Sequence, residues 1–299
     1  MSDIAIADGL PARSESTTTT VTSPRRRRRP WRLFGRYVLL SALAFIVIFP
    51  IYITVVNSLL TPTEITARPP KLFPTEPIWD TYSRAWDGGH LGKYLANSFI
   101  VTTIIVLAQL VTATLAAYAF AFLEFPLKRI LFVVFLATLM IPFEVTIITN
   151  LTTVVDLGLY DTYAGLAAPF LAWGLGSFLL RQSFLGVPRD LKDAAALDGY
   201  GHFRFLTRVV VPLSRPMIAA FAVFSFLTAW NQYLWPLLVT KDDRLRTVQI
   251  GLKQLRNTSL DQVNVTFAGI VIAVVPLAIL LIVFQKQLVR GLTAGAVKG

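Results

Sequence analysis

The sequence predicts an all-α membrane protein with six transmembrane helices. Of its 299 residues, 55% are hydrophobic and 15% are charged, and the mean hydropathy is +0.61. A soluble chain of this size could not cover so much apolar surface, whereas a bilayer accepts it directly. Six separate apolar segments reach the roughly 20 helical residues that cross the hydrocarbon. The chain has no cysteine, which excludes a disulfide framework, a thiolate nucleophile and a cysteine metal site.

Residues 1–36 are predicted to be a disordered basic cytoplasmic tail, followed by a transmembrane domain over 37–299. The tail is rich in Ser and Thr and ends in a run of arginines, Arg25–Arg29, so it cannot build a core. Arginines before an apolar stretch are also typical of a secretory or twin-arginine signal. The apolar segment 37–60 is too long for such a signal and has no small-residue cleavage site, so we expect a retained anchor helix.

The other five spans are expected at 97–123, 130–151, 162–185, 216–239 and 264–288. An even number of spans places both termini on one side of the membrane. That side would carry about nineteen Lys and Arg residues, against about nine on the other side. The positive-inside rule therefore predicts an inner-membrane, multi-pass protein with both termini in the cytoplasm.

The outer segment between the first two spans is rich in proline and aromatic residues. It is expected to form an extended strap near the membrane surface, with these residues: Pro62, Pro69, Pro70, Pro74, Pro77, Trp79, Tyr82 and Trp86.

No catalytic constellation is visible in the sequence. The two histidines, His90 and His202, have no metal-ligand neighbour at helical spacing, and the metalloprotease and serine-hydrolase motifs are missing. We therefore expect no catalytic residue, no metal site and no cofactor in this chain.

The loop 186–215, between the fourth and fifth spans, is predicted to be a short helix, a glycine elbow and a second helix. Asp190 is expected to cap the first helix, Gly199 to end it in the left-handed conformation, and Pro212 and Pro216 to stop the second helix and start the next span. The residues alone leave two interpretations open. The loop could simply close a helical hairpin, or it could lie in a groove of another protein through the small side chains of Ala194 and Ala195.

The run Asp193–Gly199, closed by Val211–Pro216, resembles the EAA loop of permease subunits from binding-protein-dependent ABC importers. Asp193 stands where the loop usually has Glu. The resemblance covers nearly the whole chain from the first span onward and points to the carbohydrate-uptake branch, specifically the second permease of maltose-type and glycerol-3-phosphate-type importers. Four further stretches carry it: Met140–Pro142, Asp156–Leu166, Trp230–Leu237 and Gly291–Gly299.

The resemblance implies a type I ABC importer permease fold and a set of partners. These are a second, different permease, two copies of an ATPase subunit that hold the ATP and Mg, and an extracytoplasmic solute-binding protein that the outer loop 240–263 would probe. The ATPase would bind coupling helices over 190–209, through Asp190, Asp193, Ala194, Ala195, Asp198, Gly199, His202, Phe203 and Arg204. A C-terminal tail would reach the same ATPase interface through Thr293, Gly295 and Lys298.

Polar side chains at membrane depth are costly and usually face a partner or a wet cavity. The candidate pathway residues are Glu144, Trp173, Trp230, Asn231, Gln232 and Tyr233. For the run 230–233, hydrogen bonding and packing between helices is the alternative. Glu144 could instead reach the outer interface. The surroundings of Trp173, between Pro169 and Gly176, fit either a bent fourth span or close helix packing at glycine.

The function expected from the resemblance is ATP-driven import of a sugar-like solute by alternating access. The stretches Trp230–Leu237 and Pro142–Val145 look closer to glycerol-3-phosphate-type than to maltose-type permeases, which favours glycerol-3-phosphate or a glycerophosphodiester. A di- or oligosaccharide is the alternative solute. An ATP-independent channel, a membrane scaffold or a membrane enzyme would be alternative classes, and no nucleic-acid partner is expected.

Overall fold

A computed structural model of the chain describes residues 30–257 and 262–293, and the described residues form helices and connecting segments without a strand. The chain divides into two structural units between Phe49 and Pro50. The helix α1 (Pro30–Leu59) begins in the first unit, earlier than the predicted start at residue 37. It is apolar from Phe34 to Leu59, which is long enough to cross a bilayer.

Three described helices are each long and apolar enough to span a membrane: α1, α4 (Leu91–Phe122) and α15 (Val263–Thr293). The 32 residues of α4 reach about 48 Å at 1.5 Å per residue. Three further pairs of helices pass the same test but are bent, which gives up to six spans if each pair is one span. The all-α membrane fold is therefore confirmed, although the predicted spans are not all continuous.

The third predicted span, 130–151, is broken. The helix α5 (Lys128–Ala137) runs into the 3-10 turn η1 (Thr138–Met140), and α6 (Phe143–Asp156) then leaves at 95°. The break falls at Ile141, whose backbone is extended (φ −88°, ψ 111°) because Pro142 follows it. The predicted span is therefore a bent pair of helices rather than one continuous helix.

The fourth span is bent by 52° between α7 (Tyr163–Ala167) with η2 (Ala168–Phe170) and α8 (Gly174–Leu185). Trp173 is extended at the bend (φ −136°, ψ 120°), which confirms the predicted bent span. Close glycine packing is present as well, because a Cβ on Gly176 would lie 2.1 Å from the Cζ atom of Phe221.

The fifth span is also interrupted. A helical run through α10 (His202–Phe205), the π-helix η3 (Leu206–Val210) and α11 (Val211–Leu213) meets α12 (Arg215–Trp230) at 82°. Pro212 lies inside this run and does not stop it; the break is at Ser214. At the other end, α12 stops before residues 231–233, and α13 (Leu234–Val239) comes next, so the predicted span 216–239 is divided.

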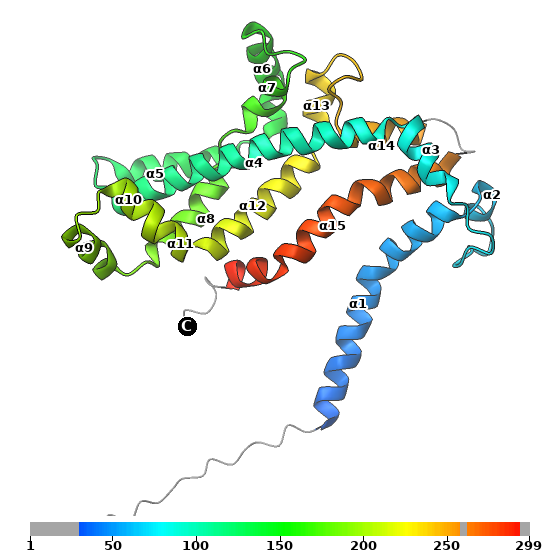
Figure 1. Cartoon of the computed structure of the whole chain (residues 1–299), viewed down its shortest axis with the longest axis horizontal. Helices are drawn as coiled ribbons and strands as arrows, with labels where there is room; N and C mark the ends of the chain where they lie inside the picture. Colours follow the sequence, from blue (N-terminus) through cyan, green and yellow to red (C-terminus); the bar gives the residue numbers. More distant parts are fainter. Residues whose placement is uncertain (1–29, 258–261, 294–299) are drawn as a thin grey trace, which may run out of the picture. The chain divides into compact units, whose positions relative to one another are not determined.

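Within the second unit, α4 packs against α8 and α12, and α12 packs against α15 (Figure 1). The buried side chain of Gln109, on α4, joins this helix to η2 and α12. Its Nε2 donates to the carbonyl of Phe170 at 2.8 Å, and its Oε1 accepts from the Ser225 hydroxyl at 2.7 Å. Because a polar group without a partner is costly in lipid, these bonds fix α4, η2 and α12 relative to one another.

The predicted outer and cytoplasmic loops lie at opposite ends of α4. At its Leu91 end, Asn97 Nδ2 donates to the carbonyls of Arg244 and Arg246 at 3.0 and 2.9 Å, and α14 (Val248–Asn257) packs nearby. At its other end, Lys192 Nζ, on α9 (Arg189–Leu197), donates to the carbonyl of Phe122 at 3.4 Å. This separation agrees with the predicted alternation of loops across a membrane.

The outer strap is partly helical rather than fully extended, since it contains α2 (Pro62–Ile65) and α3 (Asp80–Gly88). Thr61 and Glu64 form a capping box at the start of α2, and Lys71 Nζ lies 2.7 Å from Glu64 Oε1. The hydrogen bond from Lys71, helped by the backbone N–H of Thr61, lowers the pKa of Glu64 from 4.5 to about 2.

A pKa lowered by folding stabilises the strap above pH 4.5, and that stability is lost as the pH falls toward about 2. We expect the amide exchange of residues 61 and 63–65, corrected for intrinsic rates, to be constant from pH 7 to about 5 and to become faster below that. In Glu64→Gln, exchange should be faster at neutral pH and lose this acid-dependent step. A step that persists in the variant would contradict the assignment.

Gly176 offers a test of the packing between α8 and α12. In Gly176→Ala the new methyl group would meet three ring atoms of Phe221, a side chain that is fully buried. Overpacking of this kind costs about 1–3 kcal/mol, so we expect a lower Tm for the purified protein in detergent. Gly88→Ala is the control, because nothing lies within 4 Å of its added Cβ. Equal shifts in Tm would contradict the packing role.

Candidate functional site

The loop that was predicted to be cytoplasmic begins with α9, and the C-terminal end of this helix has a complete Schellman motif. Gly199 has φ +74°, and the N–H groups of Gly199 and Tyr200 donate to the carbonyls of Ala196 and Ala195 at 3.0 and 2.8 Å. The predicted left-handed glycine is confirmed. The predicted cap is not: Pro188 occupies the N-cap, and no side chain bonds there, so Asp190 lies in the first turn instead.

Some of the predicted coupling residues are used inside the chain. Ala195 is buried in the apolar cluster that contains Tyr118 and Phe205, whereas Ala194 is exposed. The two alanines therefore do not form one exposed small-residue face, because residues adjacent in a helix point in directions about 100° apart.

His202 and Arg204 are held by neighbouring rings. The Nδ1 atom of His202 lies 2.9 Å from the hydroxyl of Tyr118, and the guanidinium of Arg204 lies 4.2 Å above the ring of Tyr200. The first contact fixes the start of α10 to α4, and the second fixes α10 to the segment that connects it to α9. These two residues therefore shape the loop and leave part of their surface exposed.

The outward surface of α9 and α10 combines acidic and large apolar side chains. Asp190, Asp193 and Asp198 are exposed, and so are Phe203 (73%) and Leu197 (90%). A loop of a membrane protein gains nothing from presenting such apolar groups to water unless something covers them. Leu197 was missed from the sequence, although an apolar residue beside the polar pair Asp198–Gly199 was the available signal.

The residues of the predicted C-terminal contact fall mostly outside the described part of the chain. Thr293 is the last residue of α15, and Gly295 and Lys298 lie outside the described residues.

A cavity of about 760 Å³ lies where the three broken spans meet. Its lining residues belong to α4, to the breaks that follow η1 and η2, to α6, and to the segment that joins α12 to α13 together with the ends of these two helices. Five of the six predicted pathway residues line it: Glu144, Trp173, Asn231, Gln232 and Tyr233. Further lining residues missed from the sequence include Gln109, Thr138, Phe143, Thr146, Asn150, Phe170, Thr228 and Trp235.

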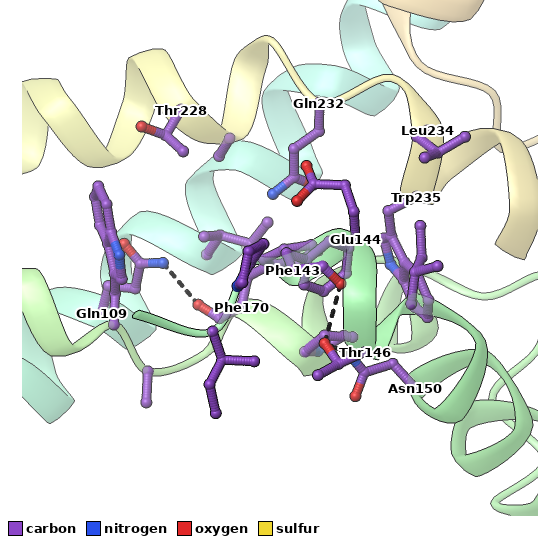
Figure 2. A pocket seen from close by; sticks show the side chains of 18 of the residues that line it. Gln109, Phe143, Glu144, Thr146, Asn150, Phe170, Thr228, Gln232, Leu234 and Trp235 are labelled. Carbon is purple, nitrogen blue, oxygen red and sulfur yellow. Dashed lines mark hydrogen bonds between the residues drawn. The ribbon is translucent and has the colours of Figure 1, made fainter. Parts of the chain in front are cut away.

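Glu144 is the one carboxylate in this lining, which contains no Lys or Arg among the described residues. It lies in the first turn of α6, where the helix dipole favours a negative charge. Figure 2 shows its carboxylate pointing toward Gln232, whose Oε1 is buried and has no partner within the described part of the chain. The cavity thus offers polar groups that are not fully used by the protein.

An aromatic cluster forms one wall of the cavity (Figure 2). The ring centroids of Phe143 and Phe170 are 4.7 Å apart, and the ring of Trp235 meets them edge-on at 5.8 and 6.3 Å. The indole N–H of Trp235 donates to the carbonyls of Gly165 and Leu166, both at 3.2 Å. The wall is therefore firmly attached to α7.

Trp230, the sixth predicted pathway residue, does not line the cavity. It is only 2% exposed and stacks on Phe226 with ring centroids 5.4 Å apart, in the core beside α15. The packing interpretation of this residue is the one that the structure supports.

Residues 109–294 match the family described as the binding-protein-dependent transport system inner membrane component. The chain belongs to this family. It is therefore a multi-pass inner-membrane component of a transport system, as the resemblance predicted.

The chain is also similar to curated relatives along most of its length. It is 39% identical over 87% of its residues to the sn-glycerol-3-phosphate transport system permease protein UgpE of Rhizobium meliloti, and covers 95% of that protein. The relative of the same name in Yersinia pestis bv. Antiqua is 33% identical over 86% of this chain, and the matched region covers 94% of that relative.

Solved structures share the fold. A chain of a bacterial ABC transporter involved in the import of the acidic polysaccharide alginate matches with a TM-score of 0.75 at 23% identity, over 86% of this chain and 97% of that one. The alginate transporter in complex with an alginate pentasaccharide-bound periplasmic protein matches with a TM-score of 0.60 at 14% identity, over 85% and 93% of the two chains. The type I permease fold is confirmed.

Proposed function

We propose that this chain is the permease subunit of an ATP-driven importer for sn-glycerol-3-phosphate or a glycerophosphodiester. The observation that carries the proposal is the 39% identity to a permease of that name over 87% of the chain. The cavity at the meeting point of three broken helices supports a solute pathway, because it is large enough for a small solute and its lining includes Gln232, whose Oε1 atom has no partner among the described residues.

The partners are inferred from the family and from the surface of the loop. A second, different permease completes the pathway, two ATPase subunits bind ATP and Mg, and an extracytoplasmic binding protein delivers the solute. The ATPase would cover Leu197 and Phe203, whose exposure supports a docking surface. Both termini would lie in the cytoplasm, and this chain would contribute no catalytic group.

Reconstitution in proteoliposomes tests the whole proposal. The chain, its partner permease and the ATPase should take up labelled sn-glycerol-3-phosphate only when ATP and the loaded binding protein are present. Uptake without ATP would favour the channel alternative. ATPase activity of this chain alone, purified to homogeneity, would contradict the non-catalytic role.

A di- or oligosaccharide remains the second candidate, because the wall of Phe143, Phe170 and Trp235 could hold the apolar face of a sugar ring. Charge distinguishes the two solutes. A phosphoester is repelled by Glu144, the one carboxylate in the described lining, whereas a neutral sugar is not.

We therefore expect Glu144→Gln to raise the uptake of sn-glycerol-3-phosphate by up to about fivefold, the effect of removing about 1 kcal/mol of repulsion. The measurement is the initial rate of uptake in proteoliposomes at saturating binding protein. Asn150→Asp is the opposite change, because it adds a carboxylate to the same cavity, and it should lower this rate. A loss of uptake in Glu144→Gln would contradict this repulsion and would favour a direct contact between the carboxylate and solute hydroxyls.

A further inference from the structure

A second cavity, of about 560 Å³, lies between the ends of α4, α5 and α8. Its lining combines four basic side chains with one acidic one, and the remainder is apolar. The charged members are Lys128, Arg129, Arg181, Arg189 and Glu124, and the apolar members are Phe120, Ala121, Phe132, Val133 and Leu185. None of them lines the solute cavity, so this lining has no role in the pathway proposed above.

The positive charge of this cavity is only slightly offset. Glu124 lies 3.6 Å from Lys128, which also donates to the carbonyl of Leu123 at 2.6 Å. Within the described residues, no carboxylate pairs with Arg129, Arg181 or Arg189. Three arginines that line one cavity without a salt-bridge partner repel one another, and a bound anion would offset that repulsion.

The guanidinium of Arg181 is already held in place for such an anion. Its Nε donates to the carbonyl of Phe120 at 3.1 Å, and its Cζ atom lies 4.2 Å above the ring of Phe132. Both contacts leave the terminal nitrogens of the fork available. A planar fork fixed in this way suits the oxygens of a phosphate group, which it can bind through two hydrogen bonds.

The position of the cavity distinguishes a lipid from a soluble anion. The basic residues lie where membrane helices end, since α4 stops at Phe122, α5 starts at Lys128 and α8 stops at Leu185. Val133, which lies one turn further into the α5 span than Arg129, is 65% exposed. Basic groups near the helix ends and an exposed apolar group further into the span match the two parts of a phospholipid.

We propose that this cavity binds the phosphate group of an anionic membrane phospholipid, with Arg129, Arg181 and Arg189 as its ligands and Val133 against the acyl chains. This site is independent of the transported solute. Basic cavities at helix ends are the places where membrane proteins recognise anionic headgroups.

Native mass spectrometry of the full-length chain in detergent tests the proposal, with added phosphatidylglycerol or phosphatidylcholine. We expect phosphatidylglycerol to bind at least about tenfold more tightly. The double variant Arg129→Gln, Arg189→Gln should bind it about thirtyfold more weakly, as expected for two basic residues at an anionic surface, with phosphatidylcholine unaffected. The control is Arg84→Gln, Lys93→Gln, which removes equal charge from α3 and the start of α4.

Several results would overturn the proposal. Equal binding of the two lipids by the unsubstituted protein would do so without relying on any variant. Displacement of phosphatidylglycerol by millimolar inorganic phosphate would assign the cavity to a soluble anion. Displacement by the ATPase subunit would make it part of a protein interface.

Discussion

Replacing Gly199 by valine abolishes ATP-driven uptake while the protein stays folded in the membrane: this is the expected result of the conformation at the end of α9. Gly199 has φ +74°, a region that a β-branched residue enters at a cost of about 1–3 kcal/mol. Nothing lies within 4 Å of the position of an added Cβ. The substitution therefore acts through the backbone alone. The chain would leave α9 in a different direction, and α10 would no longer be presented beside it.

Gly201 is the matched control for this experiment. It lies two residues away, has an ordinary φ of −74°, and also has nothing within 4 Å of an added Cβ. Gly201→Val should retain most of the uptake, and Gly199→Asn should retain part of it, because asparagine tolerates the left-handed conformation. The measurements are the uptake rate and the amount of protein in the membrane. Normal uptake by Gly199→Val would remove the reason to regard this loop as the coupling element.

The contrast between Gly199 and the broken spans shows which features a sequence can reveal. A left-handed glycine is a local requirement, so the pattern Asp198–Gly199 after a short polar helix was enough to predict it. Hydropathy likewise located the apolar segments, because crossing a bilayer requires only length and composition. The 95° break at Ile141 and Pro142 could not be found this way, since an apolar run has the same hydropathy whether its helix is straight or bent.

The two tryptophans of the stretch Trp230–Trp235 illustrate the same limit within the site. The sequence made Trp230 a candidate pathway residue, with helix packing as the alternative, but it is Trp235 that lines the cavity, while Trp230 packs on Phe226. The helix stops at residues 231–233 and restarts as α13, so the direction of every later side chain depends on that break. Gln109 was missed for a related reason: its partners, Phe170 and Ser225, are distant in sequence and are brought together only by the packing of three helices.

The second large effect is expected at Leu197, where Leu197→Asp should uncouple the permease from its ATPase without unfolding it. The side chain is 90% exposed, so its replacement removes almost no packing within the chain and should change the free energy of unfolding by less than about 0.5 kcal/mol. If the ATPase buries this leucine, the loss is about 1.5–3 kcal/mol, and an unpaired carboxylate in the interface adds to it. The affinity for the ATPase should therefore fall at least about tenfold.

A docking role and a structural role of Leu197 predict different results. Loss of a docking contact lowers the affinity for the ATPase and leaves Tm unchanged, whereas loss of a structural contact lowers Tm. The measurements are the Tm of the purified protein and a titration of the ATPase onto the permease pair in detergent. Leu197→Asn removes the apolar group without adding charge. It should cause the larger part of the loss in ATPase affinity if burial of the leucine contributes most of the binding energy at this position. Leu157→Asp is the control, since Leu157 is 66% exposed at the end of α6, away from α9. A fall in Tm with unchanged ATPase affinity would mean that Leu197 supports the fold, and the docking surface would then have to lie elsewhere on the loop.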